Sequence, residues 1–177
     1  MKNSFPIALC SVITALSIVL MLITAVLPVV AYSCVMLTGL CTALIVEEID
    51  GRYAMCVFAA VSILSAILIP DKESVILYIV FFGYYPVLKE FLLKKCKTVF
   101  SCIIKMLAFN AACTVSYITS IYVLAVPRDS FMIGDMYLPW VILIMANILF
   151  VIYDYTLDVM KKLYRIKFKK YIQKMKR

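Results

Sequence analysis

The sequence contains no histidine, and only four of its 177 residues are glycine. Without histidine, a Ser-His-Asp or Cys-His catalytic site, an H-E-x-x-H zinc site and an imidazole proton shuttle are all excluded. The phosphate-binding loops G-x-x-x-x-G-K-[ST] and G-x-G-x-x-G are also missing, so ATP and dinucleotides do not bind through those motifs. Any energy source must therefore come from another subunit or from an ion gradient.

Long polar stretches are scarce as well, because 66% of the residues are hydrophobic and only 16% are charged. Residues 5–46 contain no charged side chain, which is about twice the ~20 residues that cross a bilayer. Pro28, near the middle of this stretch, favours a helical hairpin. A cleaved signal peptide is a poorer interpretation, since the n-region would hold only Lys2 and the apolar part is far too long. The chain is therefore predicted to be an integral membrane protein.

The hydrophobic runs predict six transmembrane helices in a single bundle. The runs are about 17 to 28 residues long and do not alternate in polarity, which excludes a transmembrane β-barrel. No linker, repeat or low-complexity tract marks a second domain. We expect an all-α six-helix transmembrane domain over residues 1–177, with a basic cytoplasmic tail at 161–177 and spans near 7–26, 29–46, 53–69, 74–93, 99–126 and 137–160.

Basic residues are distributed very unevenly between the two ends of these spans. With the N-terminus inside, fifteen of the 18 lysines and arginines fall in cytoplasmic segments, Lys89 among them, while Lys72 and Arg128 lie outside. Lys105, inside the fifth span, is expected to snorkel to the inner interface. Lysine and arginine are retained on the cytoplasmic side, so both termini are predicted to be cytoplasmic in a multi-pass plasma-membrane protein. The net charge of +8 suits an anionic inner leaflet or an acidic partner, and no nucleic-acid-binding motif is present.

Carboxylates at the inner ends of two spans are the remaining candidates for catalysis. Glu47 and Glu48 close the second span, and Asp154 and Asp158 lie four apart on one face of the sixth. Two carboxylates at that spacing can hold a divalent cation with waters. A structural role is favoured, because Asp158 precedes Lys162 by four residues, the spacing of a helix-stabilising ion pair. We predict no enzyme activity, no metal and no cofactor.

The stretch FFGYYP, residues 81–86, places a proline in the middle of the fourth span. Pro86 cannot donate a hydrogen bond to the carbonyl of Phe82, and its ring clashes with that turn, so a kink and a free acceptor are expected. In lipid the freed carbonyl needs a partner or a water-filled cavity. Tyr84 and Tyr85 bring hydroxyl groups to the same depth, and buried tyrosines usually find hydrogen-bond partners.

Two asparagine side chains are predicted at the same depth, Asn110 in the fifth span and Asn147 in the sixth. Polar residues inside a membrane face the bundle interior or a solute pathway. We therefore predict a substrate-binding pocket between spans four, five and six, formed by Tyr84, Tyr85, Asn110 and Asn147. The sequence leaves open an alternative, in which these side chains only bond one helix to another.

Two residues of the outer connection 126–140 are placed at the entrance of this pocket. Arg128 suits bidentate contact with a carboxylate or phosphate. Trp140 lies at the start of a span, where an interfacial anchor is the commoner role. The aromatic walls favour a flat or partly aromatic organic solute, and the absence of histidine argues against nickel or cobalt.

The first span contains small residues four apart, Ser11 and Ala15 in ALCSVITAL, and Ala8 lies on the same broad face. Small residues at this spacing let helix backbones approach closely. With this pattern, six spans, inside termini and an outward pocket, the whole chain resembles the S component of an energy-coupling factor (ECF) transporter. That family carries alanines at this spacing, and Ser11 departs from the pattern. The resemblance implies capture of a vitamin-like solute, docking of the Ser11–Ala15 face on a transmembrane coupling subunit, and inward delivery by toppling. Separate ATPase subunits in a bacterial-type cell membrane would supply the energy.

The chain is also similar to rod-shape-determining MreD proteins, which are small multi-span membrane scaffolds. As a scaffold it would bind no solute, the asparagines would serve packing, and the basic tail would be the working surface. Leu163, Ile166 and Tyr171 lie among the lysines of that tail, which can therefore rest on the inner leaflet in either case. A third possibility, a membrane-embedded transferase, requires the inner carboxylates to converge.

Overall fold

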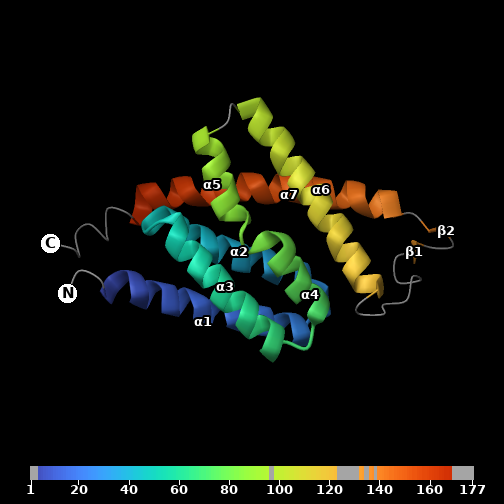
Figure 1. Cartoon of the computed structure of the whole chain (residues 1–177), viewed down its shortest axis with the longest axis horizontal. Helices are drawn as coiled ribbons and strands as arrows, with labels where there is room; N and C mark the ends of the chain where they lie inside the picture. Colours follow the sequence, from blue (N-terminus) through green and yellow to red (C-terminus); the bar gives the residue numbers. More distant parts are fainter. Residues whose placement is uncertain (1–3, 96–97, 123–131, 134–135, 138, 169–177) are drawn as a thin grey trace.

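The computed structural model describes residues 4–95, 98–122, 132–133, 136–137 and 139–168, with side chains for 5–95, 100–122 and 143–166. Figure 1 shows its elements in chain order. They are α1 (Ser4–Val26), η1 (Pro28–Val30), α2 (Ala31–Glu48), α3 (Gly51–Leu68), α4 (Lys72–Leu77), η2 (Tyr78–Phe82), α5 (Tyr85–Lys95), α6 (Thr98–Tyr122), β1 (Met132–Ile133), β2 (Met136–Tyr137), α7 (Pro139–Leu163) and η4 (Tyr164–Phe168). Strands β1 and β2 form a short antiparallel pair.

Six helical segments are long and apolar enough to cross a membrane, which confirms the predicted helical architecture and is consistent with a multi-pass membrane protein. The segments are Phe5–Val26, Pro28–Glu48, Gly51–Leu68, Lys72–Lys95, Phe100–Tyr122 and Leu143–Ile166. Helix α7 and the turn η4 continue past residue 160 to Phe168, and the boundary between the sixth span and the basic tail stays a prediction. The expected end of the fifth span, residue 126, lies outside the described residues.

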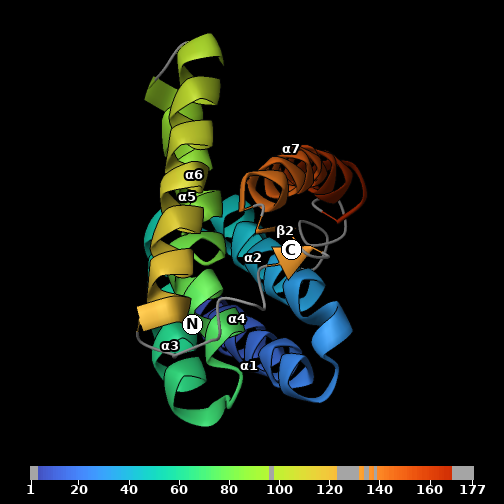
Figure 2. The same cartoon turned by 90° about the vertical axis from the view of Figure 1, so that its right-hand side faces the viewer.

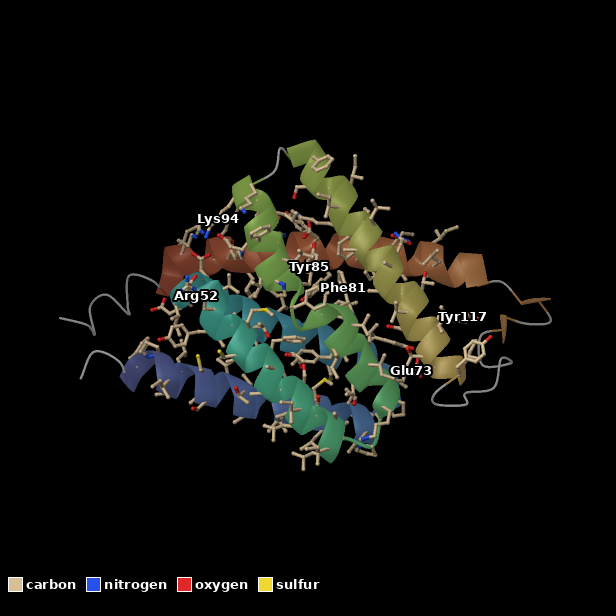
Figure 3. All side chains as sticks on the ribbon, viewed as in Figure 1. Arg52, Glu73, Phe81, Tyr85, Lys94 and Tyr117 are labelled. Atoms are coloured by element: carbon tan, nitrogen blue, oxygen red, sulfur yellow. The ribbon has the colours of Figure 1, made fainter. Side chains whose placement is uncertain are left out.

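Helix α2 lies at the centre of the bundle and contacts α1, α3, α5 and α7. In Figure 1, α2 lies between α1 and α7, and α5 and α6 extend past α7 on the side away from α1. Figure 2 shows α5 and α6 close together with α7 beside them, and α7 contacts α2 and α6. The first turn of α1 and the last turn of α7 lie at the same end, beside Arg52 and Lys94, whereas Glu73 and Tyr117 lie at the other end (Figure 3). The membrane side that the basic end faces stays a prediction.

The connections between the early helices follow from local capping chemistry. Asp50 precedes α3 and accepts a hydrogen bond from the Gly51 N–H at 2.7 Å, and Asp71 accepts from the Ser74 N–H at the start of α4. Both side chains satisfy N–H groups that a helix start leaves unpaired. Lys72 donates to the carbonyls of Ala66 and Ile69 at 2.8 Å each, which closes the end of α3.

The fourth span is broken where the sequence predicts it. After α4, residues 78–82 form a π-helical turn in which the Gly83 N–H donates to the Tyr78 carbonyl at 2.8 Å. Residues 83 and 84 form a turn, and α5 begins at Tyr85. Pro86 thus lies in the first turn of α5, where a missing N–H is tolerated. The proline explains the break, and the π-turn is an addition that the sequence does not reveal.

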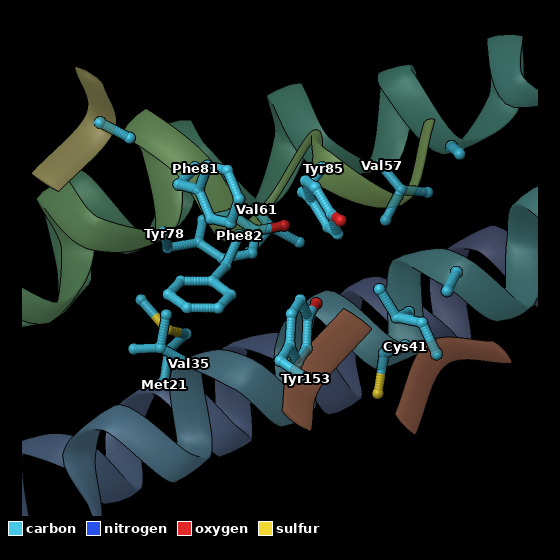
Figure 4. Packing of buried hydrophobic residues seen from close by; sticks show 14 of the residues in the cluster. Met21, Val35, Cys41, Val57, Val61, Tyr78, Phe81, Phe82, Tyr85 and Tyr153 are labelled. Carbon is cyan, nitrogen blue, oxygen red and sulfur yellow. The ribbon is translucent and has the colours of Figure 1, made fainter. Parts of the chain in front are cut away.

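The broken segment supplies the aromatic centre of the core, shown in Figure 4. Phe81 packs edge-on against Phe109 of α6 and Phe150 of α7, with ring centroids 5.1 and 5.5 Å apart. Phe82 packs in the same way on Tyr153 of α7 at 5.0 Å. These ring contacts hold α6 and α7 against the break, so side chains near the break have fixed positions.

Candidate functional site

Lys89 of α5 is completely buried in the fourth span. Its Nζ lies 2.8 Å from Asp154 Oδ1 and 2.7 Å from Asp158 Oδ1, and it donates to the Asp154 carbonyl at 2.7 Å. An ammonium group has three N–H donors, and here three acceptor oxygens surround it. Lys89 is thus held inside the bundle by carboxylates of α7, and its placement on the cytoplasmic side stays a prediction.

Lys105 of α6 is also buried, with 8% of its surface exposed. Its Nζ lies 3.2 Å from Asp154 Oδ2 and 3.5 Å from Asp154 Oδ1. Lys105 therefore has a partner inside the bundle, and its position relative to the membrane interface stays a prediction. A carboxylate within reach inside the bundle provides an ion pair, which is the usual arrangement of charges at membrane depth.

Tyr85 of α5 completes the cluster by donating its hydroxyl hydrogen to Asp154 Oδ1 at 2.5 Å. We name Tyr85, Lys89, Lys105, Asp154 and Asp158 the Asp154 network. Two lysines and two aspartates balance formally, which limits the cost of burying these charges. The side chains of Asp154 and Asp158 are 24% and 45% exposed, whereas that of Lys89 is 1% exposed. The network therefore opens to the surface on its carboxylate side.

Two matched spacings of four residues build this network. Tyr85 and Lys89 share a face of α5, and Asp154 and Asp158 share a face of α7. The predicted pair of Asp158 with Lys162 is replaced by the pair of Asp158 with Lys89. The sequence signal that could have indicated this was the position of Lys89 four residues inside its predicted span.

A second set of polar contacts lies at the last turns of α7 and at η4. It joins α7 to α5 and η4 to α2. Lys161 pairs with Glu90 at 2.7 Å, and Arg165 binds Glu47 through two N–H groups. The Tyr164 hydroxyl donates to Glu48 at 2.8 Å. Among the described residues, no group of three or more cysteines and carboxylates is placed to hold a metal ion. The inner carboxylates thus lie against basic or phenolic groups rather than against one another.

Asn110 and Asn147 meet, as their common depth suggests, and form a reciprocal pair. The Asn110 amide donates to Asn147 Oδ1 at 3.1 Å, and the Asn147 amide donates to Asn110 Oδ1 at 3.0 Å. Their other amide hydrogens bond the carbonyls of Met106 and Leu143 at 2.8 Å. All four N–H donors are therefore used, and the pair bonds α6 to α7 directly.

The four predicted pocket residues do not line one cavity in this structure. Tyr84 packs against Phe58 of α3, with ring centroids 6.0 Å apart, while Tyr85 faces Asp154. Asp154 lies seven residues beyond Asn147, or about two helical turns along α7. Arg128 lies outside the described residues, and Trp140 lies in α7 with its side chain outside the described part.

The predicted docking residues Ser11 and Ala15 line a groove of about 680 Å³ between α1 and α3. Cys56 and Ala60 contribute further small side chains from α3. The Ser11 hydroxyl donates to the Ile7 carbonyl within its own helix at 3.0 Å, which leaves the groove apolar. The small residues therefore form a concave surface on the outside of the bundle.

Comparisons of the chain with known protein families, with curated proteins and with solved structures gave no match. The functional interpretation therefore depends on the geometry of the chain itself.

Proposed function

We propose that this chain is the substrate-capture subunit of a multi-subunit importer, with a small organic solute bound between spans four, five and six. The observation that carries this proposal is the Asp154 network, whose lysines and aspartates come from those three spans. Buried charges at membrane depth are costly, and they commonly mark a solute or ion pathway. The predicted polar interior thus contains charged groups as well as tyrosines and amides.

Lys105 is the residue of the network best suited to contact a solute. Its two contacts go to a single carboxylate, at 3.2 and 3.5 Å, so an ammonium with three N–H donors keeps capacity for another acceptor. Lys89, by contrast, already has three acceptor oxygens within 2.8 Å. A solute carboxylate, phosphate or carbonyl would therefore bind Lys105, close to Tyr85. The Asn110–Asn147 pair could join these contacts only by exchanging one of its own hydrogen bonds for one to the solute.

The groove between α1 and α3 supports docking of this subunit on a membrane partner. Ser11 and Ala15 place small side chains where another helix can approach closely. Under the proposal the partner is a transmembrane coupling subunit, and ATP is hydrolysed by further subunits. The proposed location is the plasma membrane, with the basic end toward the anionic inner leaflet.

A second candidate, a membrane scaffold without a solute, is favoured by the reciprocal Asn110–Asn147 pair. Because all the amide donors of the pair are used, these residues can act purely as a contact between α6 and α7. In that case the α1–α3 groove and the basic end would be the functional surfaces.

Native mass spectrometry of the gently solubilised protein from its own source separates the two candidates. A substrate-capture subunit should carry a stoichiometric organic molecule of a few hundred daltons, with or without co-purifying ATPase subunits. An empty protein that brings cell-envelope or cytoskeletal partners would support the scaffold instead. Adding the released small-molecule fraction back to stripped protein provides a control, since a specific solute should rebind and raise Tm.

A further inference from the structure

The break in the fourth span brings a backbone carbonyl against the central helix. Pro86 has no N–H to pair with the Phe82 carbonyl four residues earlier. That carbonyl oxygen lies over Gly39 of α2, so close that a β-carbon added at position 39 would be 2.8 Å from it. Gly39 thus permits the approach of the broken span to α2.

Tyr153 of α7 reaches the same point from the other side. Its side chain is 3% exposed, and among the residues that the structure describes its hydroxyl group has no hydrogen-bond partner. A β-carbon at position 39 would also collide with this hydroxyl oxygen. A carbonyl oxygen, an unpartnered phenol and a residue without a side chain therefore converge from three separate elements.

A second buried phenol lies nearby, on the broken segment itself. Tyr78 is completely buried, and its hydroxyl group lies next to the Thr42 side chain of α2. In Figure 4 the side chains of Tyr78 and Tyr153 both lie in the layer between the broken span and α2. Of the two phenols, Tyr153 is therefore the one that lacks a neighbouring side chain to bond among the described residues.

The Tyr153 hydroxyl requires a partner from outside the chain. A buried hydroxyl without a hydrogen bond is costly, and native proteins rarely retain one. The Phe82 carbonyl, which lies at the break of the span, likewise needs a partner where its surroundings are apolar. The nearby Asp154 carboxylate is already engaged by Lys89, Lys105 and Tyr85, so the lining next to Gly39 is neutral and suits an uncharged molecule rather than a cation.

We propose that Gly39, the Phe82 carbonyl and the Tyr153 hydroxyl form a binding site for a neutral hydrogen-bonding group, which is water in the resting protein. The bound molecule accepts a hydrogen bond from Tyr153 and donates one to Phe82, the kind of bridge that buried water makes. Its role is to join α7 to the broken turn of span four. This site is separate from the proposed solute contact at Lys105, so it stands whether or not the protein captures a solute.

The direct test is a structure of the full chain in lipid nanodiscs at a resolution that shows ordered water. We expect density within hydrogen-bond distance of both the Tyr153 hydroxyl oxygen and the Phe82 carbonyl oxygen. A dry contact, or a direct hydrogen bond from Tyr153 to Phe82, would overturn the proposal. Density too large for water at the same two partners would identify the neutral polar group of a ligand and support the site.

A substitution tests the same site in solution. Removal of the Tyr153 hydroxyl in Tyr153→Phe should lower Tm by about 2–4 °C or more, because a bridging hydrogen bond is lost. The matched control is Tyr155→Phe, since Tyr155 is on the same helix but 70% exposed, and its Tm should not change. An unchanged or higher Tm for Tyr153→Phe would show that the hydroxyl had no partner and would contradict the proposal.

Discussion

The two halves of the bundle are held together by different chemistry. Helices α1, α2 and α3 pack through apolar side chains, and none of the ion pairs formed by the described residues joins one of these three helices to another. Helices α5, α6 and α7 are joined by the Asp154 network and by the Asn110–Asn147 pair. Interhelical polar contacts add to close packing in holding membrane helices together. Under the substrate-capture proposal, the polar contacts of the second half are the ones for which a polar solute would compete.

The largest expected effect comes from removing the central carboxylate of the Asp154 network in the second half of the bundle. Asp154→Leu leaves Lys89 and Lys105 buried without their shared carboxylate, and should destabilise the protein by about 3–5 kcal/mol. Thermal unfolding in detergent measures this loss. Adding Lys89→Met and Lys105→Met should restore much of it, because the network then keeps a single charge, that of Asp158, whose side chain is 45% exposed. A small loss for Asp154→Leu alone would mean that the network contributes little to the fold.

The next effect tests the close packing where the two halves meet. Gly39→Ala should cost about 1–3 kcal/mol, since its β-carbon would force the Phe82 backbone away from α2. Gly51→Ala is the control, because its β-carbon would meet only a Val87 methyl group at 3.4 Å. Denaturation midpoints of the two variants should differ clearly. Equal midpoints would refute the close approach of α2 to the broken span.

A smaller effect separates an interhelical bond from a solute contact. Asn110→Leu, Asn147→Leu and the double variant form a thermodynamic cycle, and the pair should show a coupling energy of about 0.6–2 kcal/mol. If the asparagines also contact the solute, solute occupancy should fall in each variant. Lower stability with unchanged occupancy would restrict the pair to a structural role.

The smallest effect on the isolated protein is expected in the apolar half. Ser11→Leu combined with Ala15→Leu should leave Tm nearly unchanged, because both residues line an open groove, but should abolish co-purification with the membrane partner. Val12→Phe with Val19→Phe is a matched control, since these side chains are 63% and 53% exposed on α1 and do not line the groove. Retained assembly in the first variant would remove the groove from the docking surface.

The parts of this structure that the sequence predicts depend on local chemistry. Pro86 disrupts its own turn wherever that turn lies, so the break in span four is visible in the sequence. The six spans likewise follow from the length and composition of each hydrophobic run. By contrast, Lys89 and Asp154 are 65 residues apart, and only the packing of α5 against α7 makes them partners.

Contacts between residues distant in the sequence also limit the prediction of the candidate site. Asn110 and Asn147 could be placed at one depth from the sequence, and they do meet. Tyr84 and Tyr85 are adjacent as well, but Tyr84 lies in the turn before α5 and Tyr85 begins the helix, which separates their partners. Counting lysines by span end likewise does not reveal the partners of Lys89 and Lys105, because the count contains no information about carboxylates on other helices.

The central claim is that Lys105 contacts a bound solute. The most direct test is native mass spectrometry, which compares the solute occupancy of Lys105→Met with that of the wild type. Lys94→Met is the control, since the Lys94 side chain is 71% exposed on α5. The substrate-capture proposal predicts a stoichiometric solute in the wild type and in Lys94→Met, and its loss in a folded Lys105→Met protein. A wild type purified empty from its own source, or a solute that Lys105→Met retains in full, would contradict it.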